Sequence, residues 1–109
     1  MSQATTVKEV LEAARWIIAN KGWCQGYYGK DKHGMALGSI NLATHAVSFC
    51  SLGAIEVVTK SNILQYRAEV LLRETIGDSS IGSWNDKSGQ TKEQVLKAFD
   101  LAIEKSSKL

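Results

Sequence analysis

The sequence predicts a mainly α protein, a compact bundle of about four helices with a small β-hairpin within residues 26–38. Apolar residues recur at three- and four-residue spacing in several segments, which is the period of one face of an α-helix. The chain contains no proline, and proline interrupts helix interiors. Its 109 residues, at an ordinary hydrophobic content of 44%, are enough to bury one core, so we expect a single domain over 1–109.

The first helix follows Thr6, which is a capping residue type, and Glu9 three positions later completes a capping box. Gly22 lies just after Asn20-Lys21, where a left-handed residue often ends a helix. The apolar positions between these signals form one stripe: Val7, Val10, Leu11, Ala14, Ile17 and Ile18. A helix from about residue 7 to residue 20 is therefore predicted.

Glycines and polar residues interrupt residues 23–38, which are not expected to be helical. Tyr27-Tyr28 before the polar turn 30–33, and Met35-Ala36-Leu37 after it, pair as a short hairpin. Because an isolated two-stranded hairpin is barely stable, we expect it to lie against the helices.

A second helix is predicted from Leu42 to Thr59, because small and apolar residues there keep helical spacing. Gly53 inside it costs about 1 kcal/mol relative to alanine. A glycine at this cost indicates that another backbone approaches closely, so this segment is expected to be the central, most buried helix.

Two further helices are predicted after this one. Ser61 caps the third, which runs to about Ile76 and stops at Gly77. Thr91 opens the last, with Gln94 at the capping-box position. Residues 78–90 between them are expected to form a loop, and residues 104–109 are expected to fray.

Composition excludes several classes of function. The net charge of +2 is too small for a dedicated nucleic-acid-binding protein. No apolar run reaches the roughly 20 residues of a membrane span, and no export signal precedes the first helix. We therefore expect a cytoplasmic protein without membrane contact, in which Cys24 and Cys50 remain reduced thiols.

The segment after the first helix is the first candidate binding site. Trp23, Gln25, Tyr27 and Tyr28 combine aromatic rings with glycines, a pattern that can stack on a planar base or anchor a protein partner. Lys30, Lys32 and His33 in the adjacent turn would add positive charge toward a phosphate. The alternative is that the rings only cover one end of the bundle.

Trp84, Asn85 and Asp86 form the second candidate. Asn and Asp after an aromatic residue hydrogen-bond their own backbone and turn the chain, which favours a structural role. In the functional alternative, Asn85 and Asp86 line a pocket and contact a ligand.

Metal and thiol chemistry are the weakest candidates. Two cysteines and two histidines could bind zinc, but their spacing matches no zinc motif, so no metal or other cofactor is expected. His45 and Cys50 are five residues apart, which places them on different faces of a helix. A thiol-dependent enzyme using Cys50 with His45 or His33 is therefore the least favoured interpretation.

Taken together, several motifs resemble those of a family of small uncharacterised proteins from bacteria and their phages. They are Gly22-Trp23-Cys24-Gln25-Gly26, the Cys50–Ala54 segment, Trp84-Asn85-Asp86, and Thr91–Leu96, in which Gln94 stands where glutamate is common. The similarity spans about residues 10–103. It implies no activity, since the family is of unknown function, and it makes a phage origin an expectation.

Two function classes lead the sequence-based interpretation. The first is a non-enzymatic binding protein that captures an anionic, nucleotide-like small molecule, which in a phage would sequester a signal of host defence. The alternative is a protein–protein adaptor or an inhibitor of a host protein that uses the same aromatic surface. A homo-oligomer is also expected, with apolar residues outside the main stripes forming the contact: Val57, Val58, Leu72 and Leu101.

Overall fold

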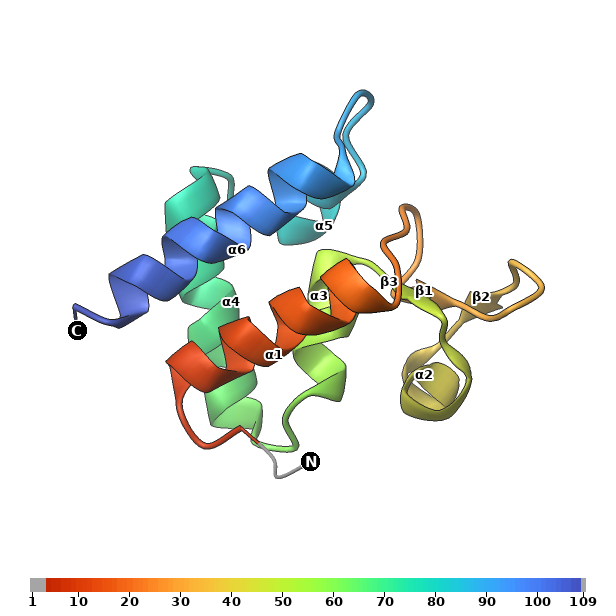
Figure 1. The fold of residues 1–109 in the computed structure, drawn as a ribbon, viewed down its shortest axis with the longest axis horizontal. Helices are drawn as coiled ribbons and strands as arrows, with labels where there is room; N and C mark the ends of the chain where they lie inside the picture. The colour runs from red at the N-terminus through yellow and green to blue at the C-terminus, as the bar shows by residue number, and fades with distance from the viewer. Residues whose placement is uncertain (1–3, 109) are drawn as a thin grey trace.

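The computed structural model describes residues 4–108, which form six helices and one small three-stranded sheet (Figure 1). The mainly α prediction is confirmed, although the described part of the chain has more helices than expected. The elements in order are α1 (Val7–Asn20), β1 (Gly29–Lys30), β2 (Ala36–Leu37), α2 (Ser39–His45), β3 (Ser48–Phe49), α3 (Ser51–Val57), α4 (Asn62–Ile76), α5 (Ile81–Asn85) and α6 (Lys92–Ser106).

The first helix forms as predicted, with a shifted capping box. The Thr6 hydroxyl accepts a hydrogen bond from the Glu9 backbone N–H at 3.1 Å. The Glu9 carboxylate accepts from the N–H and the hydroxyl of Thr5, one residue earlier than the standard box. The C-cap of α1 is Lys21 in a right-handed conformation, and Gly22 after it has a φ of 150°, a positive value that residues with a side chain rarely adopt. A Cβ there would lie 3.0 Å from the Val47 carbonyl oxygen, which explains the glycine.

The predicted hairpin is confirmed, and it gains a third strand. Gly29 pairs with Leu37 and Lys30 with Ala36, so the strands begin just after the two tyrosines. β3 adds to the other edge of β1, in the order β2-β1-β3. The Asp31 carboxylate accepts from the N–H groups of His33 and Met35, each at 2.9 Å, and closes the turn.

The prediction of one helix from Leu42 to Thr59 is wrong, because this segment divides into α2, β3 and α3. Ser48 and Phe49 pair with β1, and the Phe49 N–H also donates to the Gly22 carbonyl at 3.0 Å. These sheet bonds outweigh the helical spacing of the apolar residues. Cys50 then caps α3, its sulfur accepting from the Gly53 N–H at 3.3 Å.

Gly53 permits a close backbone approach, as the sequence predicts. A Cβ at this position would overlap the Tyr28 carbonyl oxygen and lie 2.9 Å from the Tyr28 carbonyl carbon. The Cys50 N–H donates to that same carbonyl at 3.0 Å. α3 is therefore fixed directly against the residue that leads into β1.

The predicted helix α4 is confirmed at both ends, and α6 is confirmed at its N-terminal end. Ser61 caps α4, and Gly77 ends it with a left-handed φ of 70°. Thr91 and Gln94 form the full capping box of α6. The expected fraying of 104–109 is wrong as far as Ser106, where α6 ends, and Leu109 lies outside the described residues. The predicted 78–90 loop contains the short helix α5, capped by Ser80.

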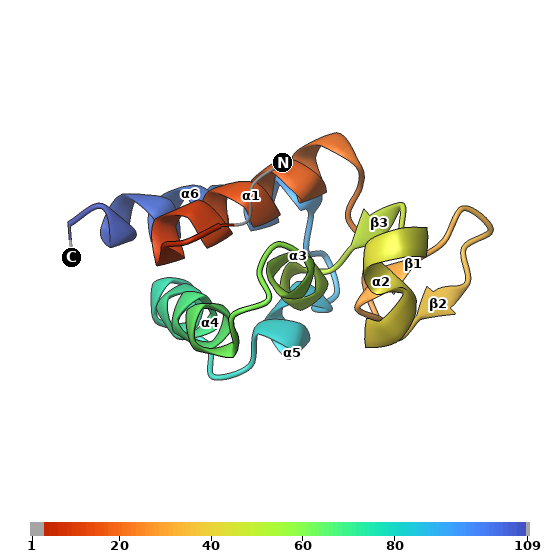
Figure 2. The same ribbon diagram turned by 90° about the horizontal axis from the view of Figure 1, so that it is seen from below.

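One hydrophobic core joins these helices. α1 packs against α3, α4 and α6, while the sheet and α2 project at one end (Figure 2). The largest fully buried apolar side chains are Phe99, Leu11, Ile18, Leu42, Ile55 and Leu72. The residues expected to form an oligomer contact do not form a surface: Leu72 is fully buried, Val57 and Val58 pack on the core, and Leu101 alone among them is exposed.

Candidate functional site

Asn85, the last residue of α5, is the centre of a buried hydrogen-bond network. Its side chain is fully buried. The Asn85 Oδ1 atom accepts from the backbone N–H of Ser51 at 3.0 Å, the Ser51 hydroxyl at 2.7 Å and the Trp23 indole N–H at 2.8 Å. Its Nδ2 donates to the Cys24 carbonyl and to Asp86. One amide thus connects α5 to α3 and to the segment after α1.

The same two segments are joined again next to this network. The Gln25 amide donates to the backbone carbonyls of Asn85 and Lys87, each at 3.1 Å. The Asp86 carboxylate accepts from the Gly26 N–H at 2.9 Å. The structure therefore places Trp23 and Gln25 beside Asn85 and Asp86, and the contacts of Trp23, Gln25 and Asn85 are those of a structural link.

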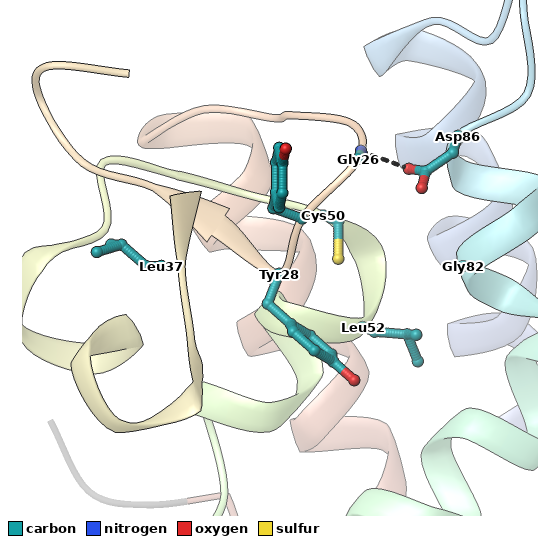
Figure 3. Close-up of a pocket in the computed structure, with 8 residues that line it drawn as sticks. Gly26, Tyr28, Leu37, Cys50, Leu52, Gly82 and Asp86 are labelled. Atoms are coloured by element: carbon teal, nitrogen blue, oxygen red, sulfur yellow. Dashed lines mark hydrogen bonds between the residues drawn. The ribbon is translucent and has the colours of Figure 1, made fainter. Parts of the chain in front are cut away.

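A hollow of about 260 Å³ opens beside this link (Figure 3). Tyr27 and Tyr28 line it, and both side chains are about half exposed. Asp86 lines it from the end of α5 (Figure 3). The remaining lining residues, Gly26, Leu37, Cys50, Leu52 and Gly82, come from the hairpin, α3 and α5. We name this feature the tyrosine hollow.

The lining of the tyrosine hollow is mainly apolar, and the polar side-chain groups of its residues are the two tyrosine hydroxyls and the Asp86 carboxylate. Asp86 Oδ1 accepts from Gly26 and from Asn85, whereas Oδ2 has no hydrogen-bond partner among residues 4–108. No lysine or arginine is among its lining residues within that range. Lys30 is outside the lining, and its ammonium group lies 5.8 Å from the centre of the Tyr27 ring. The hollow thus offers a carboxylate acceptor in its lining, and Lys30 supplies a positive charge beside Tyr27.

Trp84 does not join the other predicted site residues. It is partly buried against the core and lines two hollows with Gln90 and Gln94, away from the tyrosine hollow. The Gln90 amide donates to the Trp84 carbonyl at 2.8 Å. Adjacent residues of a helix point about 100° apart, so Trp84 and Asn85 face different neighbours.

Five lining residues of the tyrosine hollow were not predicted to contact a ligand: Gly26, Leu37, Cys50, Leu52 and Gly82. Nothing in their local pattern marks them, because they come from three separate elements. The tyrosines were found because adjacent aromatic residues before a polar turn are a local signal.

The geometry does not support a thiol nucleophile. Cys50 is buried, and burial raises the pKa of its thiol to about 11. His45 is exposed at the end of α2, where its ring contacts the Thr44 hydroxyl at 2.7 Å. Within residues 4–108 no group of three or more His, Cys, Asp or Glu side chains could hold a metal ion.

The raised pKa predicts that Cys50 resists alkylation. At pH 8 a thiol of pKa about 11 should react with iodoacetamide about a hundredfold more slowly than the same cysteine in the unfolded chain, because only the thiolate attacks. Mass spectrometry of the Cys50 peptide at timed quenches measures this rate. The chain in guanidinium is the control, and equal rates in the two states would contradict the prediction.

Comparison with known proteins identifies the family of this chain but no activity. Residues 2–105 match a family described as a family of unknown function, DUF6197, and the chain belongs to it. No curated protein and no solved structure matches the chain. Within the described part of the chain, each helix is too short or too polar to cross a bilayer.

Proposed function

We propose that this member of DUF6197 is a non-enzymatic binding protein that captures a small nucleotide-like molecule in the tyrosine hollow. The observation that carries the proposal is that Tyr27 and Tyr28 line the same hollow as Asp86. One oxygen of the Asp86 carboxylate, Oδ2, accepts no hydrogen bond from any described residue. Aromatic rings contact the face of a planar base, and a carboxylate oxygen accepts from the amino or N–H group at its edge.

The dimensions of the hollow limit how such a molecule would bind. Its volume of about 260 Å³ is just below that of typical ligand pockets, which span ~300–1,000 Å³. A base therefore fits the hollow better than a whole nucleotide does. The phosphate of such a ligand would remain outside the hollow. There it would pair with the ammonium group of Lys30, which lies above the Tyr27 ring.

A thermal-shift screen of nucleosides, their monophosphates and cyclic dinucleotides tests the proposal. A ligand at 100 times its dissociation constant should add about 2.7 kcal/mol, which corresponds to roughly 10 °C for a domain of this size. Y27A and D86N should each remove the shift. In D86N the new amide still offers an oxygen to Gly26 but presents a donor in place of Oδ2.

A control variant, and a comparison of phosphorylated ligands with nucleosides, show whether a shift comes from binding in the tyrosine hollow. Trp16, 52% exposed on α1, matches Tyr27 in exposure but lies outside the hollow, so W16A should keep the full shift. Phosphorylated ligands should bind more tightly than nucleosides, and K30A should remove that difference. No shift from any ligand, or a shift that survives Y27A and D86N, would overturn the proposal.

A protein–protein adaptor is the second candidate, and one observation favours it. Five exposed large apolar side chains lie between residues 27 and 47, in the part of the molecule that projects from the bundle: Tyr27, Tyr28, Met35, Ile40 and Val47. Ile40 is 93% exposed. Exposed apolar groups of this kind are typical of protein-binding surfaces. A screen in which no ligand raises the melting temperature would favour the adaptor function.

Capture without turnover would act by lowering the free concentration of the ligand. If the chain is phage-encoded, as the sequence motifs suggest, the captured molecule would be a nucleotide signal of host defence. Such a role requires the protein to be abundant relative to its ligand rather than fast.

A further inference from the structure

The outward side of α4 carries an apolar stripe that the bundle leaves uncovered. Ile63 and Tyr66 are 65% and 63% exposed, and Val70 follows one turn later. A groove of about 360 Å³ runs along this side, lined by Val7, Tyr66, Arg67, Val70, Leu71 and Glu74. In Figure 2, α4 lies at the edge of the bundle, with α1 and α3 beside it, so this side faces away from the core. We name it the α4 groove.

Two opposite charges flank the middle of the α4 groove. Arg67 and Glu74 are exposed, and neither forms an ion pair within residues 4–108. They are seven residues apart, about 10.5 Å along the helix. Val70 and Leu71 lie midway between them and also line the groove. The positive and negative ends are therefore equally distant from an apolar centre.

We propose that the α4 groove is where a second copy of this chain docks, with the two α4 helices antiparallel about a two-fold axis near Val70. A two-fold axis at that point brings Arg67 of each copy opposite Glu74 of the other, so one contact pattern is used twice. The axis also places the half-buried Val70 side chains, with the exposed Ile63 and Tyr66 side chains on the same helix, at the shared surface.

Charge complementarity is the reason to choose a second copy over an unrelated partner. A partner of another sequence would have to supply an acid and a base at the same ten-ångström spacing in reverse order. This chain supplies both by its own symmetry. The proposal is independent of the tyrosine hollow, whose lining residues lie on other elements.

Charge-swap variants of the full chain test the proposal by sedimentation equilibrium. R67E and E74R each place like charges at all four contact positions and should weaken self-association by roughly tenfold or more. The double variant R67E/E74R restores both pairs in reversed order and should associate as the natural chain does. Mixing the two single variants should give a heterodimer, because one is acidic and the other basic at both positions.

The mixing experiment separates this proposal from an effect on folding. Both positions are exposed and unpaired within the described residues, so circular dichroism of the variants should be unchanged. T44E and N41K on α2 are exposed charge changes outside the groove and should leave association intact. A monomeric natural chain, or single variants that dimerise as it does, would overturn the proposal.

Discussion

Asn85→Ala should lower the free energy of unfolding by about 4 kcal/mol, the largest effect we expect from one substitution in this chain. The side chain is fully buried and satisfies groups from two other segments, the residues after α1 and the start of α3. Its removal leaves the buried N–H and hydroxyl of Ser51, the indole N–H of Trp23 and the Cys24 carbonyl without their partner.

The size of this effect follows from the asymmetry of buried hydrogen bonds. A bond formed on folding contributes only about 1 kcal/mol net, because the unfolded groups bond to water. A buried group left unpaired costs about 1–3 kcal/mol, because it has lost water and gained nothing. Ser51 is fully buried, so water cannot reach its N–H without opening the contact between α3 and α5.

Urea unfolding followed by circular dichroism measures this change. Asn41→Ala is the matched control, because Asn41 is exposed on α2 and its side chain forms no hydrogen bond with the described residues. The control should stay within about 0.5 kcal/mol of the natural chain. A loss below about 1 kcal/mol in Asn85→Ala would mean that water replaces the amide, and that Asn85 does not hold the two segments together.

The helices that could be predicted from the sequence are those with both an apolar stripe and a cap. α1, α4 and α6 each begin after a Ser or Thr whose hydroxyl accepts from a backbone N–H three residues later. These signals are local, so they are complete within one segment of the sequence. The same is true of Gly77, whose left-handed φ ends α4.

The region between residues 39 and 57 could not be divided correctly from the sequence. Its apolar spacing is helical because α2 and α3 are both helices, and the two residues of β3 between them are too few to change the period. Their strand conformation is fixed by pairing with β1, about twenty residues earlier. A contact between residues so far apart in the sequence leaves no local signal. The helix α5 was not predicted because its five residues are too few to show a helical period.

The sequence indicated where the candidate site lies, but not which of its residues have a structural role and which line the hollow. Adjacent aromatic residues pointed to Tyr27 and Tyr28, and the sequence favoured a structural role for the Trp84–Asp86 motif. The structure gives Asn85 that structural role, and it leaves one oxygen of Asp86, a lining residue of the hollow, without a hydrogen-bond partner among residues 4–108. Which neighbour each side chain faces depends on the turn of α5, and that helix was not visible in the sequence.

Gly53→Ala should lower the free energy of unfolding by about 3 kcal/mol, in the upper part of the range for overpacking a buried position. The added methyl would overlap the carbonyl oxygen of Tyr28, which is backbone and cannot rotate away as a side chain would. That carbonyl also accepts the Cys50 N–H, so moving it breaks the bond that leads into α3. Denaturant unfolding measures the loss.

Gly82→Ala is the matched control for this substitution, because it adds the same methyl to a helical glycine that borders the tyrosine hollow. Its Cβ would meet nothing closer than Leu52 Cδ1 at 3.6 Å, an ordinary contact. Reduced freedom of the unfolded chain should then stabilise the protein by about 0.4–1 kcal/mol. If the free energy of unfolding falls in Gly53→Ala and rises in Gly82→Ala, the rim of the hollow is rigid where α3 meets Tyr28 and open where α5 faces Leu52. Equal and small effects would show that residue 28 yields to the methyl, and the position of its ring over the hollow would then not be fixed by α3.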